Sequence, residues 1–287
     1  MILAETVWNG KAALGEGPLW DEGEQVLYWV DIDGYKLHRF NPKTNDDQQL
    51  SFAQHLSAVV KKAGGGFVLA MGDGLYLYEE ERLTPYFLLP QGGKQLRFND
   101  AKCDPAGRLW AGTMAFDCHS PIGALYCLDH NGQISKVISG LAISNGLAWD
   151  EEKGLLYHNE TASARTTAYH FDEQTGQISE PRMIDIPYRS YNGRPDGMAI
   201  DENGYLWIAL YGAGKVICAD PDNGNVLEEV VVPATNVTSC AFGGEDYRTL
   251  YVTTANKQGE PEGGSVFAGQ SRKCRLAGTH IPLTGIA

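Results

Sequence analysis

The chain has 287 residues, of which 43% are hydrophobic, so its length and composition allow it to bury a large core. Its net charge of −13 disfavours nucleic acid and anionic membranes as partners, because an acidic protein repels phosphate groups. The N-terminal segment has neither the basic region nor the apolar run of a signal peptide. No segment approaches the roughly 20 consecutive apolar residues that span a bilayer. We therefore expect a cytoplasmic protein without membrane or nucleic-acid partners.

The six cysteines and seven histidines form no recognisable metal-binding pattern. The sequence contains no C-x-x-C pair, no H-E-x-x-H motif and no other paired histidine spacing. A zinc site built from thiolate or imidazole groups is therefore not indicated. In a cytoplasmic protein we expect the cysteines to be reduced and mostly buried in the core.

Short runs of aromatic and β-branched residues, separated by polar or glycine-containing turns, recur along the chain in six successive units. Each unit opens on a small or polar residue, and the six openings are Glu16, Ser57, Asn99, Asn145, Asp196 and Thr238. They are spaced by 41, 42, 46, 51 and 42 residues. A period of about 40 to 50 residues with three or four short strands per unit is typical of the blades of a β-propeller. No Trp-Asp ending recurs as in WD40 repeats, and no helical period supports a solenoid.

The opening strand of each unit is followed by further strands. We expect these at residues 25–31, 36–41, 66–71, 74–78, 107–113, 123–128, 154–158, 167–171, 204–209, 214–219, 249–254 and 264–267. The sequence thus predicts an all-β protein in which residues 1–287 form a single six-bladed propeller domain. We expect the strand before Trp8 to pair with the tail after Phe267, which would close the ring and protect its edges.

In a propeller the innermost strand of each blade lines the central channel, so the unit openings should become neighbours. All six openings carry oxygen in their side chains. Two carboxylates in a confined channel repel each other unless a cation lies between them. We therefore predict a central channel in which Glu16, Asn145 and Asp196 bind one divalent cation. Oxygen ligands suit Ca²⁺, Mg²⁺, Mn²⁺ or Zn²⁺, and the pattern does not choose among them.

Several motifs occur in order along nearly the whole chain. They are Glu16-Gly17-Pro18-Leu19-Trp20, Arg97-Phe98-Asn99-Asp100, Asp104-Pro105-Ala106-Gly107-Arg108, Ala111-Gly112-Thr113-Met114-Ala115, Ser144-Asn145-Gly146-Leu147-Ala148 and Pro195-Asp196-Gly197-Met198. Together they resemble the family of sugar lactonases (gluconolactonases), regucalcin and luciferin-regenerating enzyme. The resemblance implies a six-bladed propeller with a divalent cation held by Glu16, Asn145 and Asp196. It places substrate contacts on Arg97 and Asn99. Asp117 stands where the family often has a glutamate; we expect a substrate contact there, with a changed sugar preference because the side chain is shorter.

The chemistry that the resemblance implies is metal-assisted hydrolysis of a sugar lactone, such as glucono-, galactono-, arabinono- or xylonolactone, to the aldonic acid. Asp196 would act as general base as well as ligand, Arg97 and Asn99 would orient the substrate, and Asp100 would support Arg97 or its strand. Two alternatives remain: a non-catalytic, calcium-binding regulatory propeller, and a metal-dependent esterase or organophosphatase. A serine hydrolase is disfavoured because no G-x-S-x-G motif occurs. We expect a small-molecule substrate and a monomer or weak homo-oligomer.

Overall fold

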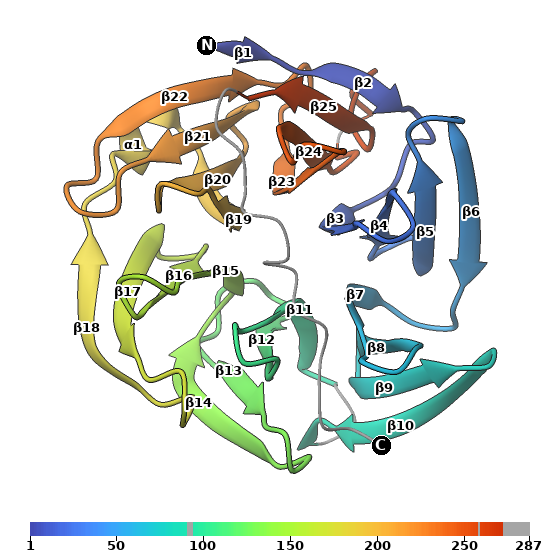
Figure 1. Ribbon diagram of the computed structural model, residues 1–287, viewed down its shortest axis with the longest axis vertical. Helices are drawn as coiled ribbons and strands as arrows, with labels where there is room; N and C mark the ends of the chain where they lie inside the picture. The colour runs from blue at the N-terminus through green and yellow to red at the C-terminus, as the bar shows by residue number, and fades with distance from the viewer. Residues whose placement is uncertain (91–93, 258, 272–287) are drawn as a thin grey trace.

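The computed structural model describes residues 1–90, 94–257 and 259–271. In these residues, short strands form six sheets that are arranged as a ring around a common axis (Figure 1). This arrangement confirms the six-bladed β-propeller predicted from the sequence. The prediction that residues 1–287 form one domain stays a prediction, since the last sixteen positions lie outside the described residues.

The first three blades each contain four consecutive antiparallel strands. The first blade comprises β3 (Gly15–Asp21), β4 (Val26–Asp31), β5 (Lys36–Asn41) and β6 (Asp46–Ser51). The second comprises β7 (Leu56–Lys61), β8 (Phe67–Met71), β9 (Gly74–Glu79) and β10 (Arg82–Leu88). The third comprises β11 (Leu96–Cys103), β12 (Leu109–Ala115), β13 (Gly123–Leu128) and β14 (Ile134–Leu141).

The remaining blades follow the same plan, and the last two also include N-terminal strands. The fourth blade comprises β15 (Ser144–Asp150), β16 (Leu155–Glu160), β17 (Arg165–Phe171) and β18 (Ile178–Ile184). After the short helix α1 (Tyr188–Tyr191), the fifth comprises β19 (Arg194–Ile200), β20 (Leu206–Tyr211), β21 (Lys215–Ala219), β22 (Val226–Val231) and β1 (Ile2–Leu3). The sixth comprises β23 (Val237–Gly243), β24 (Thr249–Thr254), β25 (Val266–Gln270) and β2 (Glu5–Trp8).

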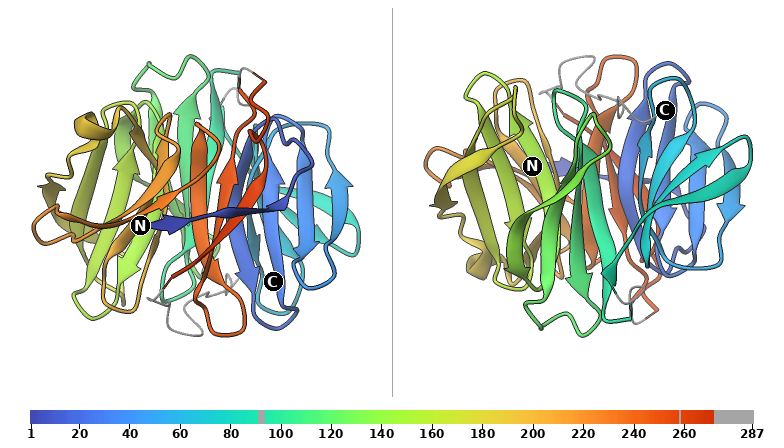
Figure 2. Two further views of the ribbon diagram at one scale, coloured as in Figure 1. Left: turned by 90° about the horizontal axis from the view of Figure 1, so that it is seen from above. Right: turned by 90° about the horizontal axis from the view of Figure 1, so that it is seen from below.

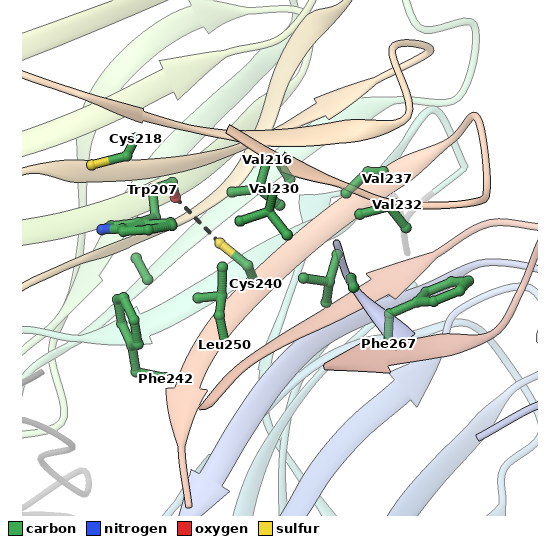
Figure 3. Packing of buried hydrophobic residues seen from close by; sticks show 14 of the residues in the cluster. Trp207, Val216, Cys218, Val230, Val232, Val237, Cys240, Phe242, Leu250 and Phe267 are labelled. Carbon is green, nitrogen blue, oxygen red and sulfur yellow. Dashed lines mark hydrogen bonds between the residues drawn. The ribbon is translucent and has the colours of Figure 1, made fainter. Parts of the chain in front are cut away.

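Hydrophobic side chains fill the space between neighbouring blades. Figure 3 shows this packing between the fifth and sixth blades, where Trp207 meets Phe242 edge to face with ring centroids 5.5 Å apart. The Cys240 thiol contacts the Trp207 carbonyl oxygen at 3.3 Å in the same layer. Such layers hold the blades rigidly about the axis, so that side chains placed on the inner strands have fixed neighbours.

The N-terminal segment closes the ring, as predicted. Strand β2 pairs antiparallel with β25, with Thr6 opposite Phe267, and β1 pairs parallel with β22 of the adjacent blade. In Figure 2 the N-terminal strands cross the outside of these two blades. The part of the expected C-terminal pairing that falls beyond residue 271 lies outside the described residues. Because β2 covers the outer edge of the last blade, that edge is not left open to another chain.

Each of the six inner strands contains a register shift near its beginning. The shifts fall between Glu16 and Leu19, Leu56 and Ala58, Phe98 and Ala101, Asn145 and Leu147, Pro195 and Met198, and Val237 and Ser239. All six predicted unit openings therefore lie at such a β-bulge. A bulge leaves a residue unpaired and redirects its side chain, which is why bulges are common beside functional sites.

Glycines follow three of these bulged residues, and at two of them, Gly146 and Gly197, the next blade packs closely against the glycine. A Cβ atom on Gly146 would lie 2.5 Å from the carbonyl oxygen of Asp196, and one on Gly197 would collide with the side chain of Ser239. Any larger residue would push neighbouring inner strands apart. The glycines thus allow the bulges of the fourth, fifth and sixth blades to approach one another at the axis.

Two other sequence-based expectations concern the cysteines and the membrane. The five cysteines in the described part of the chain form no disulfide, and Cys127, Cys218 and Cys240 are buried; Cys274 lies outside it. Within the described residues, no helix has the length and hydrophobicity needed to cross a bilayer.

Candidate metal and substrate site

The structure brings Glu16, Asn145 and Asp196 together at the axis, from β3, β15 and β19. Their side chains are only 7%, 4% and 6% exposed. The Asn145 amide nitrogen donates hydrogen bonds to the Asp196 carboxylate and, at 3.1 Å, to Thr161 Oγ1. Glu16 lies near enough to Asp196 for the two carboxylates to repel each other. Three blades thus supply the predicted ligand set to one buried place.

The charges in this place are unbalanced. Burial is the main cause that raises the pKa of Glu16 well above its usual value, and the negative charges of Asp196 and Asp100 raise it further. Burial and Asp100 likewise raise the pKa of Asp196, and burial raises that of Asp100. Arg97 opposes the effect on Glu16 and Asp196 only in part. A cation between several buried carboxylates would stabilise their charged form.

The side-chain oxygens of Glu16, Asn145 and Asp196 form the kind of donor set that fits a hard divalent cation. Among the described residues, no group of three or more His, Cys, Asp or Glu side chains is arranged to hold a metal ion. The predicted set instead combines the amide oxygen of Asn145 with the carboxylates of Glu16 and Asp196. Such all-oxygen sets suit Ca²⁺, Mg²⁺ or Mn²⁺ better than a soft metal.

Arg97 and Asn99 lie next to this set and hold each other. Arg97 Nη1 donates to Asn99 Oδ1 and to the Phe98 carbonyl oxygen, both at 2.9 Å. Asn99 Nδ2 donates to the Ser144 carbonyl oxygen at 3.0 Å. Both side chains are 7% exposed. Arg97 is therefore oriented by the hydrogen bonds that it donates to Asn99 and the Phe98 carbonyl oxygen. Asp100 acts instead on Glu16 and Asp196 through its charge.

Asp117 is placed differently from the other predicted site residues. It lies in the loop after β12, and its carboxylate accepts hydrogen bonds from the backbone of His119 and Ser120, both at 2.8 Å, and from the Ser120 hydroxyl. These bonds, that of the hydroxyl first, lower the pKa of Asp117 to about 2. The adjacent Cys118 interacts electrostatically with Arg97. The loop thus lies at the Arg97 end of the axis, but the hydrogen bonds of Asp117 to described residues stay within the loop.

Three ring side chains at the same end were not predicted as site residues. His55 packs edge to face against Tyr35, with centroids 5.0 Å apart, and against Phe116 at 5.8 Å. Burial first, and then the charge of Arg97, lowers the pKa of His55. Tyr35 and Phe116 are 36% and 46% exposed. These residues come from loops of three blades at positions without a repeat pattern, so the sequence gives no signal for them.

Hydrogen bonds from side chains to backbone also join one inner bulge to the next. Ser57 Oγ donates to the Phe98 carbonyl oxygen and Thr238 Oγ1 to that of Gly15, both at 2.6 Å. Asn159 Nδ2 donates to the Asp196 carbonyl oxygen at 2.8 Å. Ser57 and Thr238, predicted as part of the channel wall, are therefore buried supports of the neighbouring bulges.

Two cavities lie along the axis beyond the ligand set. The smaller, of about 30 Å³, is bordered by Asp100, Lys102 and Ser239 and has room for about one water molecule. The larger, of about 280 Å³, lies near the ends of β15 and β19 and is lined by residues such as Asp150 and Asp201. None of the predicted site residues lines the larger cavity, so it is not the place where their chemistry would occur.

Comparisons with known proteins show the family to which the chain is similar. Residues 14–256 match the family model described as "SMP-30/Gluconolactonase/LRE-like region". YvrE of Bacillus subtilis, provisionally named a sugar lactone lactonase, is 40% identical over 269 residues, covering 91% of this chain and 92% of that protein. Regucalcin of Oryctolagus cuniculus is 36% identical over 280 residues, covering 93% of each.

Solved structures show the same relationship. A luciferin-regenerating enzyme superposes with a TM-score of 0.91 at 29% identity, covering 99% of this chain and 100% of that one. A regucalcin of Agrobacterium tumefaciens, described as a calcium-binding protein, superposes with a TM-score of 0.86 at 25% identity, covering 96% and 99%. The likeness therefore extends over nearly the whole chain.

Proposed function

The chain belongs to the SMP-30/gluconolactonase/LRE-like family, and from this premise we propose that it hydrolyses a sugar lactone to the aldonic acid with the help of a divalent cation. The observation that carries the proposal is the convergence of Glu16, Asn145 and Asp196 from three blades on one buried place. Three carboxylates, those of Glu16, Asp100 and Asp196, are gathered here, and burial raises the pKa of each. A purely structural role does not explain why so many acidic groups share one buried position.

We assign the cation to Glu16, Asn145 and Asp196. When bound, it would supply a Lewis acid that polarises the lactone carbonyl. Asp196 accepts the proton of the attacking water. Its hydrogen bond from Asn145 fixes the direction of the carboxylate. Hydrolysis adds water across the ring ester, so the product is the open-chain hydroxy acid and no leaving group departs.

Arg97 is the group that we expect to orient the substrate. Its Nη1 is engaged by Asn99 and the Phe98 carbonyl, which holds the guanidinium plane so that its other nitrogens can donate to the lactone oxygens. His55 lies near enough to Arg97 to be affected by its charge, and Tyr35 and Phe116 pack on His55. These three rings can pack against the C–H groups of a sugar ring. Asp117 would contact the substrate only if its carboxylate gave up its hydrogen bonds from His119 and Ser120 and accepted one from a substrate hydroxyl instead.

One alternative is favoured by a specific observation. Relatives that match over most of the chain are named regucalcin, and one solved relative is described as a calcium-binding protein. The same ligand set could then serve calcium binding without turnover. Both readings use Glu16, Asn145 and Asp196, so cation binding alone does not separate them.

Acid release separates the two functions. Purified protein is mixed with glucono-, galactono-, arabinono- and xylonolactone, and the acid formed is followed by titration at constant pH. We expect hydrolysis of at least one lactone that a chelator stops and an added divalent cation restores. Asp196→Asn should abolish it, whereas Asp172→Asn, at an exposed turn of the fourth blade, should not. Cation binding without turnover on any of the lactones would instead support the calcium-binding function.

A further inference from the structure

Lys102 reaches from β11 across the axis to two other blades. Its Nζ donates hydrogen bonds to the carbonyl oxygens of Leu147 in β15 and Met198 in β19, both at 2.8 Å. The side chain is partly buried. An ammonium group has three donors and no acceptor, and it is stable in such a place only with oxygen atoms arranged around it.

The two acceptors lie directly beside the proposed ligands. Leu147 ends the register shift that begins at Asn145, and Met198 ends the one that contains Asp196. Each bulge is a part of the strand where the regular pairing is interrupted. A single ammonium group therefore holds the backbone of both bulges, and it does so from the strand that carries Arg97 and Asn99.

Lys102 also lines both of the cavities described above. It borders the small cavity next to Asp100 and, on its other side, the larger cavity near the ends of β15 and β19. Its charge partly offsets the effect of burial on Asp100. The lysine thus lies between the cluster of carboxylates and the opposite end of the axis.

We propose that Lys102 is a positioning residue that sets the separation and direction of Asn145 and Asp196 by clamping their bulges to β11. The inference rests on the proposed cation site but not on lactone hydrolysis. The side chains of Ser57, Thr238 and Asn159 each connect two blades. Lys102 connects three blades. Residues that orient ligands from behind typically affect metal affinity by about 10- to 100-fold.

Two effects of removing Lys102 act in opposite directions, which makes the inference testable. Loss of the clamp lets the two bulges move and weakens cation binding. Loss of a positive charge near the site removes the repulsion between the lysine and the cation, which strengthens cation binding. If the lysine acted through its charge alone, its removal would tighten binding.

The test compares Lys102→Met, which keeps the length but removes the donors and the charge, with Lys102→Arg, which keeps both. Lys215→Met is the matched control, because Lys215 is also partly buried and pairs with Glu229 at 2.8 Å on β22, away from the axis. Calcium and manganese binding are measured by calorimetry. We expect Lys102→Met to raise Kd about 10- to 100-fold, Lys102→Arg to recover part of the affinity, and Lys215→Met to leave it unchanged.

Hydrogen–deuterium exchange of the protein in chelator supplies a readout that needs no cation. Peptides covering the first halves of β15 and β19 should exchange faster in Lys102→Met than in wild type or Lys215→Met. If Lys102→Met does not fold, Lys102→Gln takes its place, since it keeps an N–H₂ donor without the charge. Unchanged or tighter cation binding in the folded variant, or unchanged exchange at both bulges, would overturn the inference. A wild-type protein that binds no cation would contradict the proposed function, while the exchange result would still decide the role of Lys102.

Discussion

Asn99 and Arg97 form a pair in which each residue fixes the other. The Asn99 side chain accepts from Arg97 Nη1 at 2.9 Å through Oδ1, and it donates to the Ser144 carbonyl oxygen at 3.0 Å through Nδ2. The amide therefore connects the guanidinium of the third blade to the backbone of the fourth, one residue before Asn145. A buried arginine whose Nη1 is held in this way is ready to bind an anionic or carbonyl oxygen through its other nitrogens without rearrangement.

Replacing Asn99 with alanine should weaken substrate binding. Arg97 would keep the Phe98 carbonyl oxygen but lose the Asn99 side chain as an acceptor. A hydrogen bond to a charged group is worth about 1.5–3 kcal/mol, which corresponds to a KM about 10- to 100-fold higher on the preferred lactone. Steady-state kinetics would measure kcat and KM for Asn99→Ala, with Asn223→Ala at an exposed turn as control. An unchanged KM would show that Arg97 does not depend on Asn99 for its orientation.

Adding a divalent cation should stabilise the protein. Binding to the folded state alone raises the free energy of unfolding by about 2.7 kcal/mol when the cation concentration is 100 times Kd. Thermal melts with and without calcium would measure the shift. Glu16→Gln should abolish it, and this variant in chelator should also melt above the wild type, because one of the buried, mutually repelling carboxylates is gone. A calcium-induced shift that persists in Glu16→Gln would remove Glu16 from the ligand set.

The inner parts of the blades were predictable from the sequence, and the outer strands were not. Residues 26–30 and 206–209 are continuous apolar runs, and the structure buries them in β4 and β20 between blades. The strands β6, β10 and β18 have no such pattern, because they lie at the outer edge of the ring and most of their side chains are exposed. Two of them even contain proline, which an edge strand tolerates.

The convergence of three opening residues at the axis was likewise predictable because their position repeats. Glu16, Asn145 and Asp196 occupy the same place in their units, and the ring symmetry converts that place into one point on the axis. Lys102 and His55 do not repeat, and their roles depend on which loop or carbonyl of another blade they face. Such contacts follow from the packing of the ring, so no single unit of the sequence contains the information.

Trp8 should be a main contributor to ring closure. It packs edge to face on Trp29, with centroids 4.6 Å apart, and its Nε1 donates to Asp47 Oδ2 at 3.0 Å. Trp8→Ala removes both contacts where β2 meets the first blade, so we expect a loss of about 2–4 kcal/mol in the free energy of unfolding. Urea titrations would measure it, with Leu3→Ala, at a 71% exposed position, as control. Equal midpoints for Trp8→Ala and wild type would contradict this role.

The last prediction concerns pH and rests on His158, whose Nε2 lies 2.9 Å from Ser144 Oγ in the interior of the fourth blade. Burial lowers the pKa of His158 from 6.5 to about 4. The unfolded chain therefore takes up a proton near pH 6.5, whereas the folded protein does so only near pH 4. Stability from the neutral histidine is fully present above about pH 6.5 and is lost as the pH falls towards 4, by up to about 3 kcal/mol.

Urea unfolding between pH 4.5 and 8, in chelator so that cation binding does not contribute, would measure this loss. His158→Gln cannot take up the proton, so the difference in stability between wild type and variant should shrink as the pH falls from 7 to 4.5. His170→Gln, at an exposed position of β17, should follow the wild type at every pH. If the curves of wild type and His158→Gln ran parallel instead, His158 would be titrating alike in the folded and unfolded chains, and the acid sensitivity would have to come from other groups.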